Sequence, residues 1–153
     1  MRRKDKEISD NSEIEDILNK AQVCRLGLCE NNIPYVVPMN FGYRDGILYL
    51  HCATEGKKLD IIRANNNVCF EVDIDHELVK GGDGCNWSYK YRSVIGFGKA
   101  YILDGYEEKK LGLDAIMEHY SGQFTHQYSE KAVNAVCVIK VEIENMTGKK
   151  SGY

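Results

Sequence analysis

Residues 35–72 read YVVPMNFGYRDGILYLHCATEGKKLDIIRANNNVCFEV, and they carry the clearest structural signals in the chain. Two apolar runs rich in aromatic and β-branched residues, 35–43 and 47–52, flank the pair Asp45-Gly46. An Asp-Gly pair between such runs is the strongest short-range signal for a β-hairpin. A short helical pattern follows, and Val68 to Val72 then alternate as in a strand with one buried face. This stretch therefore predicts a hairpin, a short helix and a third strand.

The segment Gly56-Lys57-Lys58 opens the helical pattern. A helix N-terminus carries free backbone N–H groups and partial positive charge, so each lysine in its first turn is unfavourable by up to about 1 kcal/mol. The lysines become favourable where an anion binds, and a glycine lets that anion approach the backbone. The segment therefore predicts a phosphate site. The alternative is a pair of ordinary surface lysines.

Composition indicates a single globular domain, 1–153, because 43% of the 153 residues are hydrophobic and 28% are charged. The formal net charge of −3 gives no field that would attract nucleic acid. No apolar run reaches the roughly 18 residues of a membrane helix. The charged start MRRKDKEISD is unlike a secretory signal, so we expect a cytoplasmic protein with no membrane or nucleic-acid partner. The polar ends, 1–10 and 146–153, are expected to be flexible arms.

No metal site or disulfide is predicted. The six cysteines include no C-x-x-C pair, so we expect reduced thiols, with Cys85 the most exposed. The run 73–77 spaces three carboxylates as in a calcium loop, but Leu78 stands where that loop requires glycine. Three histidines lack ligand spacing and are expected at the surface: His76, His119 and His126.

The rest of the chain adds two helices and three strands to the central stretch. The helices are expected over 12–21, with a capping box at Ser12, and over 104–122, with Leu113, Ile116, Met117 and Tyr120 buried. The strands are expected over 23–29, 93–103 and 135–143, and residues 73–91 are expected to form a loop. Pro38 cannot donate to a ladder, so its strand is expected at a sheet edge. Six mostly hairpin-linked strands with flanking helices predict an α+β fold built on a small, mostly antiparallel barrel.

Four motifs together resemble a known family. They are MRRKD at 1–5, YVVPMNFGY at 35–43, HCATEGKK at 51–58 and CNWSYKYRSVIGFGKA at 85–100. Their order is similar to that of the FMN-binding split β-barrels, and more closely to the pyridoxamine 5′-phosphate oxidase-like proteins of the nitroimidazole-resistance (Nim) type. The resemblance covers nearly the whole chain.

This resemblance implies an obligate homodimer that binds two FMN molecules at its interface. The strand 37–41 would lie along the isoalloxazine ring, 51–53 and 56–58 would hold the ribityl chain and phosphate, and 92–94 would add contacts. Arg92 could instead pair with a surface carboxylate. The implied cofactor-binding residues are Val37, Pro38, Met39, Asn40, Phe41, His51, Cys52, Ala53, Gly56, Lys57, Lys58, Arg92, Ser93 and Val94.

The resemblance also implies an FMN-dependent oxidoreductase, similar to a nitroreductase. Electrons would pass from NAD(P)H or another reductant to a small-molecule acceptor, with nitroimidazoles among the candidates. His51 is the candidate catalytic residue, because imidazole exchanges protons near neutral pH; the alternative is a hydrogen-bonded strand histidine. The tail offers only Lys149 and Lys150 as basic residues, so oxidation of pyridoxamine phosphate itself is not expected.

Two further readings stay open. The first is a dimeric module that binds flavin or haem without catalysis, with His51 or His126 as haem ligand. The second is a structural dimer with an empty groove, in which Lys57 and Lys58 would be replaceable. A Ser-His-Asp or Cys-His hydrolase is not expected, because no nucleophile lies in an elbow motif.

Overall fold

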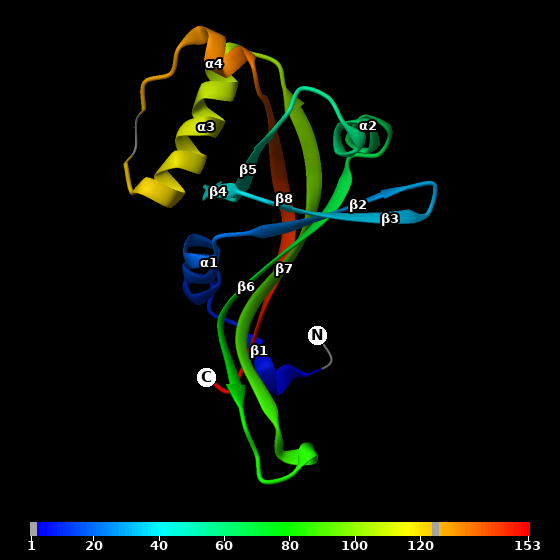
Figure 1. The fold of residues 1–153 in the computed structure, drawn as a ribbon, viewed down its shortest axis with the longest axis vertical. Helices are drawn as coiled ribbons and strands as arrows, with labels where there is room; N and C mark the ends of the chain where they lie inside the picture. The colour runs from blue at the N-terminus through cyan, green and yellow to red at the C-terminus, as the bar shows by residue number, and fades with distance from the viewer. Residues whose placement is uncertain (1–2, 124–125) are drawn as a thin grey trace.

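The computed structural model describes residues 3–123 and 126–153, and within them one antiparallel sheet carries four helices (Figure 1). The strands are β1 (Glu7–Ile8), β2 (Cys24–Glu30), β3 (Ile33–Met39), β4 (Phe41–Arg44), β5 (Ile47–Cys52), β6 (Asn67–Val79), β7 (Ser88–Leu103) and β8 (Cys137–Ser151). The helices are α1 (Asn11–Lys20), α2 (Lys57–Ala64), α3 (Tyr106–Ser121) and α4 (Glu130–Asn134). The predicted α+β split barrel is confirmed, with eight strands in place of six.

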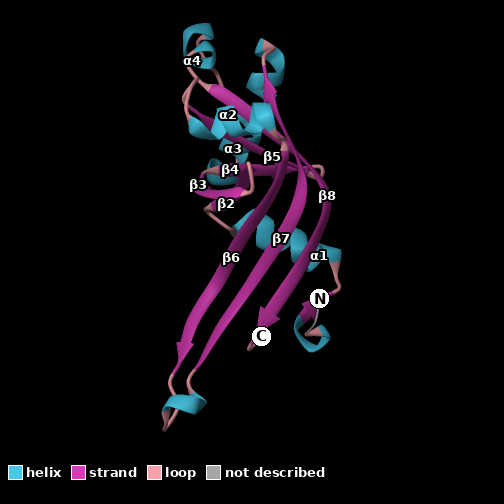
Figure 2. Cartoon of the chain, turned by 90° about the vertical axis from the view of Figure 1, so that its right-hand side faces the viewer, coloured by secondary structure: helices cyan, strands magenta, loops and turns pink. Residues whose placement is uncertain are grey.

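The strands follow the order β3-β2-β6-β7-β8-β5-β4, and β1 pairs with β8 outside this path. Figure 2 shows the long strands β6, β7 and β8 running side by side and curving along the molecule. The first and last strands of the path, β3 and β4, are joined through Asn40 alone, so the sheet bends round towards closure. α3 and α4 lie at one end, and a hairpin formed by β6 and β7 projects from the other (Figure 1).

Two tight turns with left-handed backbone set the short hairpins. Asp45 and Gly46 have φ of 51° and 78°, and they confirm the predicted hairpin by joining β4 to β5. Asn31 and Asn32 have φ of 50° and 64° and join β2 to β3. The predicted strand before Asp45 is wrong as one unit, because the chain changes partner at Asn40. The residues before Asn40 pair with β2, and the residues after it pair with β5.

β3 is an edge strand, as Pro38 predicted. Pro38 lies opposite Arg25 of β2, and no other described strand pairs with β3. A proline has no N–H to donate. On the free side of an edge strand no neighbouring strand needs that N–H, so no ladder hydrogen bond is lost.

The expected loop over 73–91 is confirmed only for residues 80–87 and is wrong for the rest. β6 and β7 continue through it, separated by a short 3₁₀ turn at Gly84–Asn86. We call residues 77–90 the hairpin arm. Within the arm the Lys90 ammonium lies 3.1 Å from the Glu77 carboxylate in a cross-strand ion pair, and most side chains are exposed. The strand pattern was hidden because most side chains of the arm are exposed and the ladder register shifts just before Glu77.

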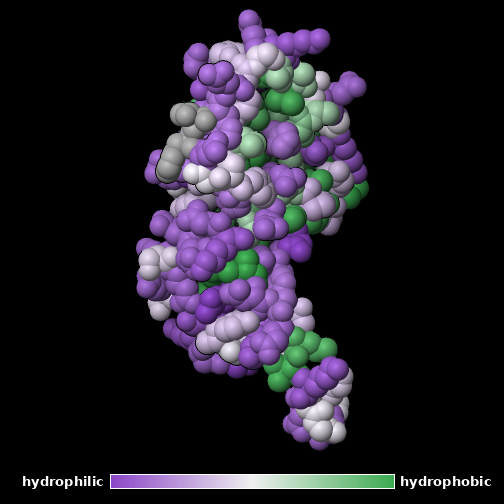
Figure 3. Space-filling model, turned by 60° about the vertical axis from the view of Figure 1, so that its left-hand side comes forward, coloured by the Kyte–Doolittle hydropathy of each residue, from purple (hydrophilic) through white to green (hydrophobic). Residues whose placement is uncertain are grey.

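The hairpin arm exposes apolar side chains. Leu78, Trp87 and Tyr89 are 51%, 49% and 49% exposed. Figure 3 shows hydrophobic surface on the arm where it leaves the body. The arm therefore presents apolar side chains to solvent in the single chain.

The expected arms at the two ends of the chain are also wrong for most of their length. β8 runs on to Ser151, because β7 pairs with it on one side and β1 on the other. Ile8 is buried, and the Asp10 carboxylate caps α1 by accepting a hydrogen bond from the Ser12 N–H at 2.9 Å. The cap residue is therefore Asp10, two positions before Ser12, where the capping box was predicted. Residues 1–2 of the expected N-terminal arm lie outside the described residues.

The apolar core forms two clusters on opposite sides of β5 and β8. Successive strand residues face opposite ways, so Leu50 joins the larger cluster with Phe41 and Phe70, and Tyr49 joins the smaller one. α1 and α2 cover the larger cluster, and α3 covers the smaller one. In the described ranges no helix combines the length and apolar composition that crossing a membrane requires.

α3 packs through small residues and not through the whole predicted stripe. Gly112 and Ala115 are buried, whereas Met117 and Tyr120 are 36% and 40% exposed. A Cβ on Gly42 of β4 would lie 2.3 Å from the Ala115 carbonyl oxygen. Ile116 of the predicted stripe is buried and Leu113 packs against the smaller cluster, so the hydrophobic pattern identified the buried face of α3 only in part.

Candidate functional site

The turn before α2 gathers nitrogen donors. Gly56 caps the helix with φ of 135°, a conformation that favours glycine, and nothing lies within 4 Å of the place of a Cβ. The N–H groups of Leu59 and Asp60 bond to the Gly56 carbonyl at 2.9 and 3.3 Å. Lys57 and Lys58 precede them, and no side chain caps this N-terminus. Uncapped helix N–H groups with two ammonium groups form a donor set suited to phosphate.

Lys57 links this turn to the edge strand β3. Its ammonium nitrogen lies 4.9 Å from the centroid of the Tyr35 ring, in a cation–π contact. Both side chains also border a small hollow of about 70 Å³ beside the β2–β3 turn. The strand and the turn that the resemblance assigns to one cofactor therefore lie side by side.

The start of β4 and the end of β5 meet at an open surface. Phe41 pairs with Leu50, so Asn40 and His51 occupy the next positions outward, and both are exposed. Pro38 and Ala53 are exposed as well, and Val37 is half-buried. Within the described part of the chain, the His51 ring has no hydrogen-bond partner, which does not support the alternative of a bonded strand histidine. Its catalytic role stays a prediction.

Tyr120 of α3 holds the junction of β3 and β4. Its hydroxyl accepts hydrogen bonds from the Phe41 N–H at 3.2 Å and from the Asn40 amide at 3.3 Å, and it donates one to the Gln22 carbonyl at 2.7 Å. Sequence reasoning missed this positioning residue. Nothing local signals it, because its partners lie 79, 80 and 98 positions away.

Three of the predicted cofactor residues have core side chains. Met39, Phe41 and Val94 are 7%, 0% and 0% exposed and belong to the larger cluster. For Met39 and Phe41 the backbone is therefore the part that can face a ligand. The Val94 backbone is paired with β6 on one side and β8 on the other, so Val94 offers neither its side chain nor its backbone.

Arg92 lies in a separate ion-pair network. Its guanidinium is 3.0 Å from the Asp75 carboxylate and 3.7 Å from that of Glu13. The Tyr153 ring lies 4.7 Å away in a cation–π contact, and its hydroxyl donates to the Asp75 carbonyl at 2.7 Å. Within one chain Arg92 thus forms the carboxylate pairs of the alternative, and its contact with a cofactor stays a prediction.

The structure does not bring Arg92–Val94 to the turn at 56–58. β7 meets the chain just after α2 at Ala100, whose N–H bonds to the Asn66 carbonyl at 2.8 Å. Arg92 is eight positions from Ala100 in β7, which is about 26 Å at the rise of a strand. A single chain cannot supply both segments to one ligand.

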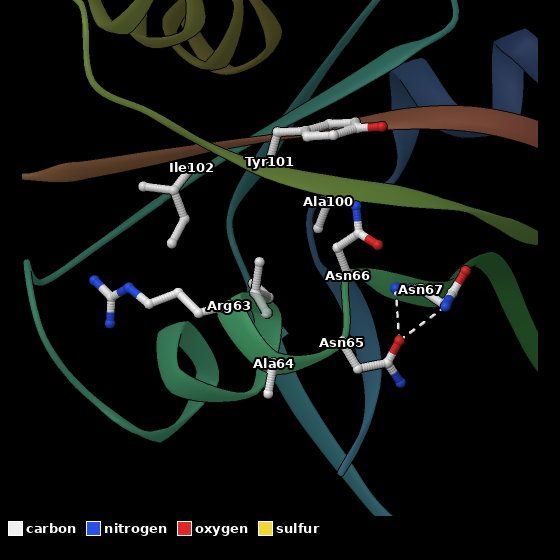
Figure 4. A pocket seen from close by; sticks show the side chains of 9 residues that line it. Arg63, Ala64, Asn65, Asn66, Asn67, Ala100, Tyr101 and Ile102 are labelled. Atoms are coloured by element: carbon white, nitrogen blue, oxygen red, sulfur yellow. Dashed lines mark hydrogen bonds between the residues drawn. The ribbon is translucent and has the colours of Figure 1, made fainter.

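A second hollow lies at the other end of α2. It measures about 510 Å³ and is lined by Arg63, Asn65–Asn67 and Tyr101 of β7 (Figure 4). The Asn65 side-chain oxygen accepts hydrogen bonds from the Asn67 N–H and amide at 3.2 and 2.8 Å. An eight-residue helix, about 12 Å long, separates this hollow from Lys57. The hollow is therefore not part of the predicted cofactor site.

Two histidines form local contacts away from the turn at 56–58. His119, expected at the surface, is half-buried with Nε2 2.7 Å from the Ala21 carbonyl, and burial lowers its pKa. Ser121 Oγ lies 3.2 Å from His126 Nε2, but the Asp114 carboxylate accepts from the His126 backbone N–H and not from the ring. These residues therefore form no Ser-His-Asp relay. No group of His, Cys, Asp and Glu side chains in the described residues could hold a metal ion.

Residues 10–150 match the family model described as pyridoxamine 5′-phosphate oxidase. A search of the curated proteins found no match. Among solved structures, a Bacteroides thetaiotaomicron protein provisionally named as a 5-nitroimidazole antibiotic resistance protein is 41% identical, with a TM-score of 0.83 over 94% of this chain and 86% of its own.

Other solved structures share the fold. A FAD-binding protein from Mesorhizobium loti is 25% identical, with a TM-score of 0.67 over 94% of this chain and 96% of its own. The FAD and heme binding protein from Mycobacterium smegmatis is 20% identical, with a TM-score of 0.84 over 97% of this chain and 74% of its own. At 20% identity the likeness shows the fold alone.

Proposed function

Because this chain belongs to the pyridoxamine 5′-phosphate oxidase family, we propose that it is an FMN-binding flavoprotein that transfers electrons to a small acceptor. The contact between Lys57 and Tyr35 carries the proposal. It places an uncapped helix N-terminus with two lysines beside the edge strand β3. Phosphate at the turn and a flat ring along the strand account for both features.

The donors at the turn fit the phosphate monoester of FMN. Lys57 and Lys58 neutralise a dianion, and Gly56 leaves room for its oxygens to reach the helix N–H groups. An edge strand has unpaired backbone groups on its free side. Those of β3 can bond to the polar rim of the isoalloxazine ring, and Pro38 marks the position where no donor is offered.

We place the cofactor between two copies of the chain. Pro38, Asn40 and His51 are exposed, so one chain provides only one wall of the site. β7 exposes Ile95 at 45% and Phe97 at 51%, and apolar surface of this kind indicates an interface. The contacts predicted for 92–94, which lie along β7 away from the turn at 56–58 of the same chain, would then come from the second copy.

FMN supplies, when bound, electron transfer from a nicotinamide or another reductant to the acceptor. The residues of the chain bind and orient. Lys57 and Lys58 hold the phosphate, and Tyr120 fixes the backbone at the junction of β3 and β4. His51, exposed at the end of β5, would supply or accept a proton for a bound acceptor. Nitro compounds are the proposed acceptors, supported by the name of the 41% identical Bacteroides protein.

Absorption spectroscopy and FMN titration test the proposal. Protein mixed with FMN and desalted should keep the flavin bands. Lys57→Ala with Lys58→Ala should weaken FMN binding by roughly 2–5 kcal/mol, because each charged hydrogen bond contributes about 1.5–3 kcal/mol. As a matched control, Lys20→Ala with Lys131→Ala removes the same charge from exposed positions on α1 and α4 and should leave FMN affinity unchanged.

Three outcomes would contradict parts of the proposal. Unchanged FMN affinity in the Lys57/Lys58 variant would overturn the phosphate site. A Soret band in place of flavin bands would assign the haem-binding alternative. Bound FMN that neither NADH nor NADPH reduces, and that when chemically reduced passes no electrons to a nitroimidazole, would leave a flavin-binding module without this activity.

A further inference from the structure

Cys52 and Cys137 lie directly opposite each other in the β5–β8 ladder. Opposed residues of antiparallel strands have Cα atoms about 4.5–5.5 Å apart, within the range of about 4.4–6.8 Å that a disulfide spans. Cys52 and Cys137 are also the last residue of β5 and the first residue of β8, so the pair lies at the end of the ladder. The strand register therefore places the two cysteines where a disulfide can join them.

The other four cysteines lack this arrangement. Cys24, Cys29 and Cys69 lie in strands, but each faces residues without a thiol. Cys85 is exposed in the turn of the hairpin arm. The opposition of Cys52 and Cys137 is therefore specific to the place where β5 ends and β8 begins.

We propose that Cys52 and Cys137 form a redox-active dithiol that closes to an intramolecular disulfide by exchange with a low-molecular-weight disulfide. The Cys52 thiolate attacks one sulfur of the oxidant, which forms a mixed disulfide and releases one small thiol. The Cys137 thiolate then attacks the Cys52 sulfur and releases the second small thiol. The protein loses two electrons and two protons, and the small disulfide is reduced to two thiols.

The environment of the two thiols indicates that Cys52, and not Cys137, attacks the small disulfide first. Its side chain is half-buried, whereas Cys137 is 5% exposed, so a small oxidant reaches Cys52 first. Burial raises the pKa of both thiols, and that of Cys137 reaches about 11. The Lys58 charge opposes this rise at Cys52, and those of Lys109 and Arg63 oppose it at Cys137. Exchange is therefore slow at neutral pH and faster in mildly alkaline solution.

Formation of the Cys52–Cys137 disulfide would restrict the segment that leads to the predicted anion-binding turn. Cys52 is the last residue of β5, and residues 53–56 connect it directly to α2. A disulfide would tie this point to β8 and restrict the segment. The dithiol rests on the register of two strands and does not depend on FMN, so it can be tested on protein without cofactor.

Thiol exchange with oxidised glutathione tests the pair. Protein is equilibrated in mixtures of oxidised and reduced glutathione at mildly alkaline pH, quenched by alkylation and mapped by peptide mass spectrometry. We expect one linked peptide pair that joins Cys52 to Cys137 within a chain. Cys137→Ser should trap glutathione on Cys52, because the resolving thiol is absent. Cys69→Ser, a matched change in β6, should form the same link as the wild type.

The wild-type map alone can overturn the proposal, so the test does not depend on a folded variant. If Cys85 acquires glutathione while Cys52 and Cys137 both remain alkylatable after unfolding, the pair is not redox-active. A link that joins other cysteines, or that joins two chains, would also overturn it.

Discussion

Cys24 shows how burial couples a single side chain to pH. Its thiol on the inner face of β2 is 0% exposed. Burial raises its pKa from 9.0 to about 12, with the Glu71 carboxylate adding to the rise. Above pH 9 the unfolded chain releases this proton while the folded chain keeps it. The free energy of unfolding therefore falls as pH rises through this range.

We predict that Cys24→Ala lessens this alkaline loss of stability. Between pH 9 and pH 11 the free energy of unfolding should fall less in the variant than in the wild type, by roughly 1.4 kcal/mol per pH unit. Urea denaturation under reducing conditions measures both slopes. Cys85→Ala, at an exposed position, should keep the wild-type slope. Parallel slopes for wild type and Cys24→Ala would show that the thiol does not carry the effect.

At the candidate site, the sequence was enough to identify residues whose role depends on neighbours in the chain. Gly56, Lys57 and Lys58 could be identified because the glycine, the lysines and the helix start are contiguous. Tyr120 and Cys137 could not be identified. Their partners, Phe41 and Cys52, lie about 80 positions away in the chain and are brought near by the sheet.

At the scale of elements, the contact between β4 and α3 depends on a missing side chain. A Cβ on Gly42 would lie 2.3 Å from the Ala115 carbonyl oxygen and 2.6 Å from the Ile116 nitrogen. The backbone of α3 would have to move to admit it. The same helix carries Tyr120, so its position also decides the backbone at the candidate site.

We predict that Gly42→Ala destabilises the fold by about 1–3 kcal/mol, the usual cost of overpacking a close contact. Urea denaturation measures the loss. Gly84→Ala serves as the matched control, because a Cβ there would meet nothing within 4 Å, and its free energy of unfolding should stay close to that of the wild type. A Gly42→Ala protein as stable as the Gly84→Ala protein would show that α3 has room to shift freely.

At the scale of the whole molecule, the proposed homodimer depends on the exposed apolar surface of β7 as its interface. Phe97 is 51% exposed in the single chain. An uncompensated charge buried in an interface costs on the order of 3–5 kcal/mol. We predict that Phe97→Glu yields a monomer in analytical ultracentrifugation and loses FMN in the same sample.

Leu111→Glu is the matched control for that change. Leu111 is 47% exposed and lies on α3, not on the exposed face of β7 that carries Phe97, and its replacement should leave both the dimer and FMN binding intact. If Phe97→Glu remains dimeric and binds FMN as the wild type does, the interface lies elsewhere. A monomeric wild type that binds FMN would remove the dimer from the proposal and keep the cofactor.

Residue order alone was enough for the antiparallel α+β class, the turn at Asp45-Gly46, the edge position of Pro38 and the lysine turn before α2. Each follows from backbone preferences or charges within a few residues. The change of strand partner at Asn40, the continuation of β8 to Ser151 and the opposed thiols of Cys52 and Cys137 required the folded chain. Pairing partners so distant in sequence are selected by the register and curvature of the whole sheet, which no local pattern records.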